Sequence, residues 1–270
     1  MSKQYVIAGG EAGWQRLRLL ARTMAPTTRA HLVDAGVREG MTCIDVGCGG
    51  GHVTQMLAEM VGPSGRVVGI DFDAVKLAAA AAEVERAGMR NIEFRTADVM
   101  TWREPSTYDV VFGRFILSHL PESARVLANM RDALRTGGVV VLEDIDFSGG
   151  FCHPDNDGYR RYCELYCAVV QRRGGDADLG KRLYSMVCAA GLHDAHVRVV
   201  HPVHTGRQPG KALALSTLQN IVSSVLSESL ATETELQADI DSLEAFTNDP
   251  STVIGLPRVF QVWGRTTGVQ

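Results

Sequence analysis

The sequence lacks any long apolar run. No stretch of its 270 residues approaches the ~20 consecutive apolar residues that cross a bilayer. The first residues, Met-Ser-Lys-Gln-Tyr, also lack the charged-then-apolar pattern of a secretory signal. We therefore expect a protein with no membrane partner and a cytoplasmic location.

Positive charge and cysteine are also scarce. Lys and Arg number 27 against 31 Asp and Glu, and the formal net charge is −4. Without a broad basic field, nucleic acid is not expected as a partner. There are only six cysteines, and Cys163 and Cys167 lie one helical turn apart, too close on a helix face to suggest a disulfide scaffold. Reduced thiols in a cytoplasm are the simplest account.

What the sequence does contain is a regular alternation of strand-like and helical stretches. Strands are expected at 42–46, 66–71, 91–96, 108–113 and 139–144, and helices near 52–61, 74–87 and 121–135. Such alternation indicates parallel crossovers. Further strands at 196–201 and 258–265 complete the set. The predicted fold is α/β: a doubly wound, seven-stranded, mostly parallel Rossmann-like sheet with N-terminal helices and an inserted helical cap.

The chain divides around this sheet. Residues 1–40 are predicted to be helical and to lie over a cofactor site, with a break at Pro26 and a second helix capped by Thr27 or Thr28. The sheet domain is expected at 41–202 and 251–270. The stretch 203–250 is expected to be a cap, to which 155–175 also contributes.

The cap prediction rests on charge and periodicity. Between Lys211 and Arg258 the sequence has no Lys or Arg but several Asp and Glu residues, and two helices fit the stretch. Thr232 and Glu235 have capping-box spacing at the start of the second. Apolar inner faces suit either a lid over a small, fairly apolar molecule or a homodimer interface.

A glycine-rich turn follows the first strand. Gly47, Gly49 and Gly51 alternate after Asp45, and His52 is expected to begin the next helix. Glycine there lets the backbone close on a nucleotide-like ligand. The spacing is not a clean dinucleotide-binding GxGxxG, which disfavours a nicotinamide-dependent oxidoreductase.

Acids stand at the ends of the first three strands. Asp71 after the second could accept hydrogen bonds from both ribose hydroxyls, and Asp98 after the third could accept from an adenine amino group. Each has a structural alternative: Asp71 could cap the following helix, and Asp98 could be a turn residue. Asp45 could either touch the ligand or hold the glycine turn.

Together these segments resemble the ordered motifs of class I S-adenosylmethionine-dependent methyltransferases. The resemblance covers about residues 40–145 and is carried by Asp-Val-Gly-Cys-Gly-Gly-Gly at 45–51, Gly-Ile-Asp at 69–71, Ala-Asp at 97–98, Tyr-Asp-Val-Val at 108–111 and Leu-Arg-Thr-Gly-Gly-Val at 134–139. It implies S-adenosylmethionine as cofactor. The glycine loop would face its methionine part, Asp71 its ribose and Asp98 its adenine.

Neighbouring residues are expected in the same cofactor site. They are Cys48, Phe72, Val99 and Arg114. Tyr5 and Arg16 are candidates for the methionine carboxylate, because N-terminal helices of this fold often cover the cofactor and Arg makes charge-assisted contacts to carboxylates. The alternative for Arg16 is that it is one of several exposed arginines.

Methyl transfer from a sulfonium requires mainly alignment and exclusion of water, so a universal catalytic residue is not expected. His119 is a candidate general base, the alternative being a histidine packed at a helix start. Asp144, at the end of the fifth strand with Glu143 and Asp146, could position an acceptor amine or hydroxyl or cap the next segment.

Two other groups invite a functional role. Tyr159, Tyr162 and Tyr166 have the spacing of a helical stripe, which is more typical of a core than of a pocket. His196 and His201 differ by five positions and would face opposite sides of a strand, so no metal site is expected.

The sequence therefore predicts a methyltransferase acting on O, N or C of a small, fairly apolar acceptor, possibly in secondary metabolism. The alternative is a cyclase-like enzyme that retains the cofactor on the same fold without transferring its methyl group.

Overall fold

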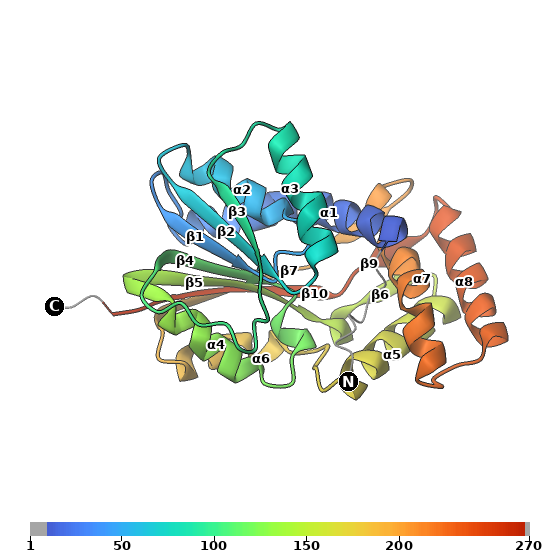
Figure 1. Cartoon of the computed structure of the whole chain (residues 1–270). Coiled ribbons are helices and arrows are strands. Elements are labelled where there is room, and N and C mark those ends of the chain that lie inside the picture. Colours follow the sequence, from blue (N-terminus) through green and yellow to red (C-terminus); the bar gives the residue numbers. More distant parts are fainter. Residues whose placement is uncertain (1–9, 268–270) are drawn as a thin grey trace.

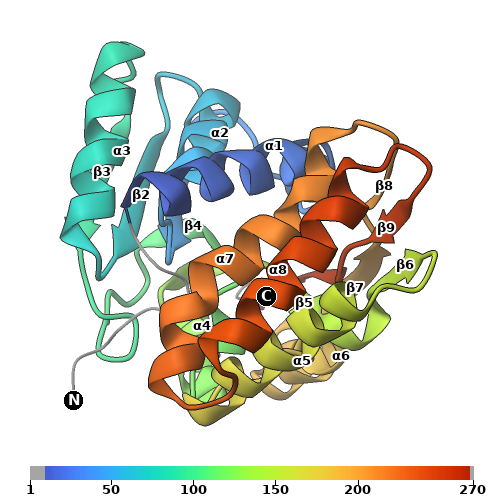
Figure 2. The same ribbon diagram turned by 90° about the vertical axis from the view of Figure 1, so that its right-hand side faces the viewer.

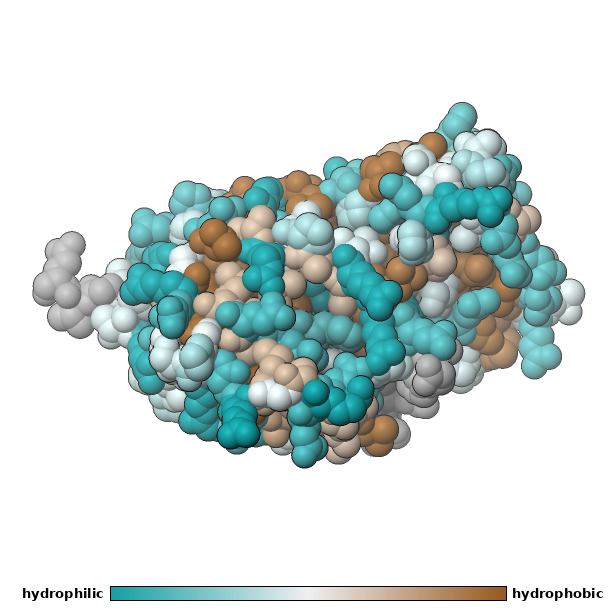
Figure 3. All heavy atoms as spheres, turned by 90° about the horizontal axis from the view of Figure 1, so that it is seen from above, coloured by the Kyte–Doolittle hydropathy of each residue, from teal (hydrophilic) through white to brown (hydrophobic). Residues whose placement is uncertain are grey.

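A computed structural model describes residues 10–267, with side chains from residue 13 onward in the first helix. Within that part of the chain, every helix is too short or too polar to serve as a membrane span. Seen from above, the surface is hydrophilic over most of its area, with smaller apolar areas between (Figure 3).

One large sheet of seven strands organises the molecule (Figure 1). Its order is β3-β2-β1-β4-β5-β10-β7, and β10 runs antiparallel to both of its neighbours. The strands are β1 Thr42–Val46, β2 Arg66–Asp71, β3 Ile92–Thr96, β4 Tyr108–Arg114, β5 Leu134–Asp146, β7 His193–Val200 and β10 Arg258–Arg265. This confirms the predicted doubly wound, mostly parallel α/β sheet.

Helices cover both faces of the sheet. On one side lie α1 Gly10–Asp34, α2 His52–Val61 and α3 Ala74–Arg86, and on the other α4 Ser123–Asp132 and α6 Gly180–Ala189 (Figure 1). Side chains on alternate strand positions point to opposite faces. Ile44 and Val111 therefore pack in one apolar core with α4 and α6, whereas Cys43 and Val110 pack in another with α2.

The cap forms at one end of the sheet from α5 Asp157–Arg172, α7 Ala212–Ser227 and α8 Glu233–Asn248 (Figure 2). The three helices pack against one another and share a core that includes Tyr162, Leu218 and Leu243. The predicted capping box is present, with the Thr232 hydroxyl accepting from the Glu235 N–H and the Glu235 carboxylate accepting from the Thr232 N–H. Both helices expected in this acidic stretch are confirmed.

The prediction of two N-terminal helices separated at Pro26 is wrong. A single helix, α1, continues through Pro26. Pro26 has no N–H for the helix ladder, but Thr27 Oγ1 donates to the Met24 carbonyl at 3.0 Å. Thr28 is not a cap, because its hydroxyl is buried against the sheet and donates to Glu143 Oε2 at 2.8 Å. Burial of Met24 and Leu32 holds both halves of the helix on the sheet.

Two strands differ from their predicted bounds. The strand expected at 139–144 is β5, Leu134–Asp146, so the glycine pair at 137–138 lies inside it, where the pairing with β4 shifts register. The strand expected at 196–201 is β7, His193–Val200, so His201 lies beyond it. This edge strand is largely exposed and begins with polar residues, so it has little of the apolar alternation that sequence patterns detect.

A small second sheet was not predicted. Its strands are β6 Phe151–His153, β9 Val253–Gly255 and β8 Val203–Thr205, in that order. Three-residue strands are too short to show a period in the sequence. Because β9 pairs with both other strands, this sheet ties together the ends of the cap segments next to β10.

Candidate active site

A cavity lies where the carboxyl ends of β1, β4 and β5 meet the cap. Its volume is about 1180 Å³, which includes the part of the cavity that is open to solvent. Its walls come from α1, the loop after β1, the segment after β4, the end of β5, α5, α7 and the start of β10. In parallel α/β sheets this edge is the usual position of a ligand crevice.

The glycine loop forms one wall of the cavity. Gly47, Gly49 and Gly51 have positive φ angles of 73°, 53° and 72°. A Cβ added to Gly47 would lie 2.8 Å from the Ile116 side chain, whereas one added to Gly49 would meet nothing within 4 Å. Gly49 lines the cavity, so its bare backbone leaves room for a ligand to approach closely.

Two carboxylates hold this loop. Asp71 Oδ2 accepts from the Gly49 N–H at 2.9 Å, and its Oδ1 accepts from the Asp73 N–H at 3.0 Å. The cap of α3 is Asp73, not Asp71. Asp45 Oδ2 accepts from Thr54 Oγ1 at 2.7 Å, which ties β1 to α2, and burial raises the pKa of Asp45 to about 6. Asp45 therefore supports the glycine loop by joining the two elements that flank it, and it also lines the cavity.

The structure divides the expected cofactor residues into two groups. On the cavity lining lie Arg16, Asp45, Gly47, Cys48, Gly49 and Arg114. Off that lining, Gly51 lies behind the loop near Phe94, and the others are at the ends of β2 and β3: Asp71, Phe72, Asp98 and Val99. Tyr5 lies outside the described residues.

The second group differs in exposure. Asp71 is buried and Phe72 is half-exposed, whereas Val99 packs into the core. Asp98 Oδ1 accepts from the Met100 N–H at 3.0 Å, as a turn residue does. A carboxylate oxygen has more than one lone pair, so these bonds leave Asp71 and Asp98 chemically able to accept from a nucleoside as well.

A buried polar network lies beneath the cavity. The Arg114 guanidinium donates to Thr28 Oγ1 at 3.2 Å and lies 3.9 Å from Glu143, which also accepts from Gln261 Nε2 at 2.6 Å. Burial raises the pKa of Glu143, and the Arg114 charge opposes that shift. This network joins α1, β4, β5 and β10 through charge-assisted bonds.

Of the two catalytic candidates, only His119 reaches the cavity. Its Nε2 lies 3.4 Å from Tyr166 Oη, and burial, followed by the charges of Arg16 and Arg173, lowers its pKa to about 4. His119 is therefore neutral at pH 7. Asp144 is buried away from the lining and accepts from the Ser118 and Ile145 N–H groups at 3.0 and 2.9 Å. Asp144 therefore fixes the turn that contains Ser118 and His119.

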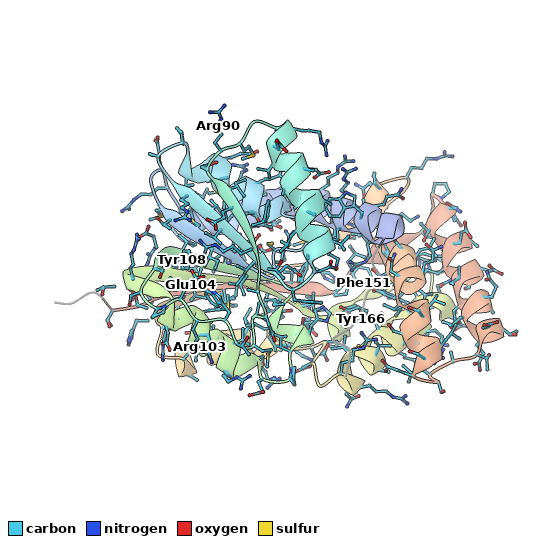
Figure 4. All side chains as sticks on the ribbon, viewed as in Figure 1. Arg90, Arg103, Glu104, Tyr108, Phe151 and Tyr166 are labelled. Atoms are coloured by element: carbon cyan, nitrogen blue, oxygen red, sulfur yellow. The ribbon has the colours of Figure 1, made fainter. Side chains whose placement is uncertain are left out.

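Aromatic side chains form the cap side of the cavity. Tyr162 and Tyr166 line it, whereas Tyr159 packs in the cap core and donates to the Gly255 carbonyl at 2.8 Å. All three tyrosines are buried in the cap core, which confirms the predicted core stripe, and Tyr162 and Tyr166 border the cavity as well. The Phe147 ring stacks on Tyr166 with centroids 4.2 Å apart and an interplanar angle of 11°. Tyr166 lies where α5 meets the end of the sheet (Figure 4).

Phe115 adds a strained aromatic residue. Its φ of 54° is in the left-handed region, which is unusual for a bulky residue and is typical of functional sites. Phe115 follows β4 directly, its N–H donates to the Glu143 carbonyl at 2.8 Å, and its ring lies on the cavity lining. The backbone bends at Phe115 instead of continuing β4. As a result, the Phe115 side chain lies on the cavity lining.

Sequence reasoning missed several wall residues. They are Phe147, Leu213, Thr217, Leu256, Pro257 and Val259. They come from β5's end, α7 and the approach to β10, segments far apart in the sequence. Each has the pattern of an ordinary core or loop residue, so only the tertiary arrangement identifies it.

The residues present fit a methionine-linked nucleoside. The open cradle over Gly49, the acids at the ends of β1, β2 and β3, and the cationic Lys76 and Arg114 on the lining supply the close approach and charges that such a group needs. Among residues 10–267, no cluster of three or more His, Cys, Asp or Glu side chains is arranged to hold a metal ion.

Comparison with known proteins is consistent with this geometry. A family model described as a methyltransferase domain matches residues 37–191. Demethylmenaquinone methyltransferase of Lactococcus lactis subsp. lactis is 34% identical over 128 residues, covering 47% of this chain and 48% of that protein. The chain thus spans about half the length of this curated relative.

Solved structures extend the likeness over nearly the whole chain. A Bacillus halodurans protein assigned as a methyltransferase has a TM-score of 0.61 at 18% identity, covering 89% of this chain and 99% of that one. A structure titled as a cyclase has a TM-score of 0.56 at 14% identity, covering 99% and 89%. At these identities the similarity establishes a shared fold.

Proposed function

The chain belongs to the methyltransferase-domain family and takes S-adenosylmethionine as its cofactor, and from this premise we propose that it methylates a small, largely apolar organic acceptor. The observation that carries the proposal is the continuity of the cavity. The glycine loop at one side and the aromatic cap wall at the other line the same space.

We assign the cofactor end to the loop side. Gly47, Cys48 and Gly49 would hold the methionine part, Asp71 and Phe72 the ribose and its surroundings, and Asp98 with Val99 the adenine. Asp45 and Arg114 support the loop and set the local charge. When bound, S-adenosylmethionine would supply a methyl group on positively charged sulfur: the acceptor's electron pair would bond to the methyl carbon, and the carbon–sulfur bonding pair would remain on the departing sulfur.

The chain's own part is to orient the acceptor and exclude water. Leu17, Leu20 and Met24 of α1 and Leu213 of α7 cover the cavity with apolar side chains. This supports the prediction that 203–250 acts as a lid together with 155–175. The alternative prediction, a homodimer interface formed by the apolar faces of these helices, stays a prediction.

His119 is better suited to orient than to abstract a proton. Its lowered pKa makes it a weak base, so we propose that it accepts a hydrogen bond or packs against the acceptor. The six free cysteines support a reducing compartment, such as the cytoplasm.

Ligand-induced stabilisation tests the cofactor assignment. S-adenosylhomocysteine should raise the melting temperature, and NAD should not. Asp71→Ala should abolish the shift. Asp73→Ala is the matched control: it removes the cap of α3, two residues away, and should lower the melting temperature while keeping the shift. Absence of any shift in the wild type would refute the assignment.

Methyl transfer itself is tested with cofactor labelled in the methyl group. Label should move into an organic product when candidate acceptors are supplied. Product formation without incorporated label would instead support a cyclase-like enzyme that retains its cofactor.

A further inference from the structure

We propose that the acceptor binds as an anion: a flat apolar molecule whose charged oxygen is recognised by Arg16 together with Thr217 and Tyr162, on the wall formed by α1, α5 and α7. This inference rests on the proposed function and names the class of molecule that the cap side of the cavity selects.

The three side chains form a connected group on the cavity lining. Arg16 Nε donates to Thr217 Oγ1 at 2.8 Å, and the Thr217 hydroxyl donates in turn to the Leu213 carbonyl at 2.6 Å. The Tyr162 ring lines the same wall of the cavity, and its hydroxyl is close enough to Arg16 for the guanidinium charge to act on it. Arg16 is half-buried, whereas Thr217 and Tyr162 are buried. A guanidinium therefore lies fixed against α7, with two hydroxyl groups beside it.

This position turns Arg16 toward the acceptor part of the cavity. Burial lowers the pKa of His119 and raises the pKa of Tyr162 and Tyr166, and the Arg16 charge is close enough to exert a smaller, lowering effect on all three values. The sequence suggested a different partner for Arg16, the methionine carboxylate. Its observed contact with α7 favours the acceptor instead.

The charge of the lining is opposite to that of the chain. The lining contains the cations Arg16, Lys76 and Arg114 and, among the described residues, one acid, Asp45. Just off the lining, Asp73 pairs with Lys76 at 3.3 Å and Glu143 lies 3.9 Å from Arg114. His119 adds no charge at pH 7. A cleft lined by one sign of charge raises the local concentration of ligands of the other sign. Although the chain carries a formal net charge of −4, the cap side of the cavity is therefore lined by the cation Arg16, which favours an anion there.

The other residues of the cavity wall indicate the shape and polarity of the rest of the acceptor. Phe115, Phe147, Tyr162 and Tyr166 present rings, and Leu17, Leu20, Leu213 and Leu256 present aliphatic side chains. Aromatic rings pack best against flat partners in offset or edge-to-face arrangements. A guanidinium makes planar, charge-assisted bonds to a carboxylate, phenolate or enolate oxygen. Together these features fit a flat apolar molecule with one anionic oxygen.

Four naphthalene probes test this inference on the full-length protein saturated with S-adenosylhomocysteine. Calorimetric titrations would compare 2-naphthoate, 2-naphthol, naphthalene and 2-naphthylmethylamine. We expect at least one oxygen acid to bind about tenfold or more tightly than naphthalene, which corresponds to about 1.4 kcal/mol. Preference for 2-naphthoate would identify a carboxylate, and preference for 2-naphthol a phenolate or enolate.

Substitutions in α1 test whether Arg16 is the group that recognises the anionic probe. Arg16→Gln should remove the preference for the anionic probe while keeping the affinity for S-adenosylhomocysteine, and Arg16→Lys should keep part of the preference. The control is Arg18→Gln, since Arg18 pairs with Glu83 of α3 and does not line the cavity.

Several results would overturn the inference. These are equal binding of naphthalene, a preference for the amine, no binding of any probe, or an Arg16→Gln variant that loses cofactor affinity and keeps the anion preference. Failure of the wild type to bind S-adenosylhomocysteine would instead contradict the proposed function, so the two failures are distinguishable.

Discussion

The Gly49 N–H donates to Asp71 Oδ2 at 2.9 Å, which joins the turn after β1 to the end of β2. The residue expected to bind the ribose thus also fixes the loop expected to face the methionine part. Loop shape and nucleoside recognition depend on the same carboxylate.

A methyl group at Gly49 should weaken cofactor binding. Gly49→Ala keeps the N–H but places a Cβ in the open cavity, and inserting such a group costs about 1–3 kcal/mol, or about fivefold to a hundredfold in affinity for S-adenosylhomocysteine. Gly137→Ala is the matched control, because Gly137 also has a positive φ and an open Cβ position but lies in β5. Both variants should lose about 1 kcal/mol of stability to backbone strain. Equal affinities would contradict the placement of the cofactor on this loop.

Removing the Thr28 hydroxyl should destabilise the docking of α1. Thr28→Val leaves Glu143 and Arg114 without one buried partner, and we expect a loss of about 1–3 kcal/mol in the free energy of unfolding by urea. The neighbouring Thr27→Val removes only a bond within the helix, to the Met24 carbonyl, and should change stability much less. A smaller effect at Thr28 than at Thr27 would show that the buried network does not hold the helix.

The strained backbone at Phe115 should reverse the usual order of glycine and alanine. Because its φ is 54°, Phe115→Gly should be about 1 kcal/mol more stable than Phe115→Ala, although both remove the ring. Phe147 lines the same cavity without a left-handed backbone, and there the alanine variant should be the more stable one. Urea unfolding of the four variants measures both differences. Alanine more stable at both positions would rule out strain at Phe115.

The lowered pKa of His119 predicts a specific pH dependence. The folded value is about 4 and the ordinary value 6.5, so the unfolded chain binds the proton more readily between them. The stability due to neutral His119 is complete above pH 6.5 and is lost as the pH falls toward 4. We expect His119→Gln to lose less stability than the wild type between pH 7.5 and 5, whereas a variant of the exposed His193 should behave as the wild type.

The lowered pKa of His119 also predicts how activity depends on pH. The kcat/KM profile should have no inflection from His119 between pH 5.5 and 8, because its imidazole stays neutral throughout that range. An inflection near 6.5 that disappears in His119→Gln would show that the residue titrates during catalysis and acts as a general base.

The sheet and the glycine loop were predictable because their patterns are local. Five strands and their crossovers alternate regularly, and the alternating glycines after Asp45 encode a turn that only glycine adopts readily. The course of α1 was not predictable. Pro26 is a helix breaker in isolation, and only the burial of Thr28 and Leu32 on the sheet overrides it.

The acceptor wall was beyond sequence reasoning for a different reason. Tyr159, Tyr162 and Tyr166 have the spacing of a core stripe and all lie in the cap core, yet Tyr162 and Tyr166 also border the cavity. Which side chains border empty space depends on where α1, α7 and the approach to β10 are placed around α5. Sequence periodicity identifies the apolar face of a helix, but it does not show whether that face packs against another element or borders a cavity.

The position of β10 has a consequence for how the protein is made. This strand, residues 258–265, inserts between β5 and β7 and pairs with both. During synthesis on the ribosome, β5 and β7 emerge without their shared neighbour and each leaves an edge open to mispairing. The sheet closes only when the last strand arrives. Premature termination before residue 258 should therefore yield an aggregation-prone chain, even though every residue of the glycine loop is already present.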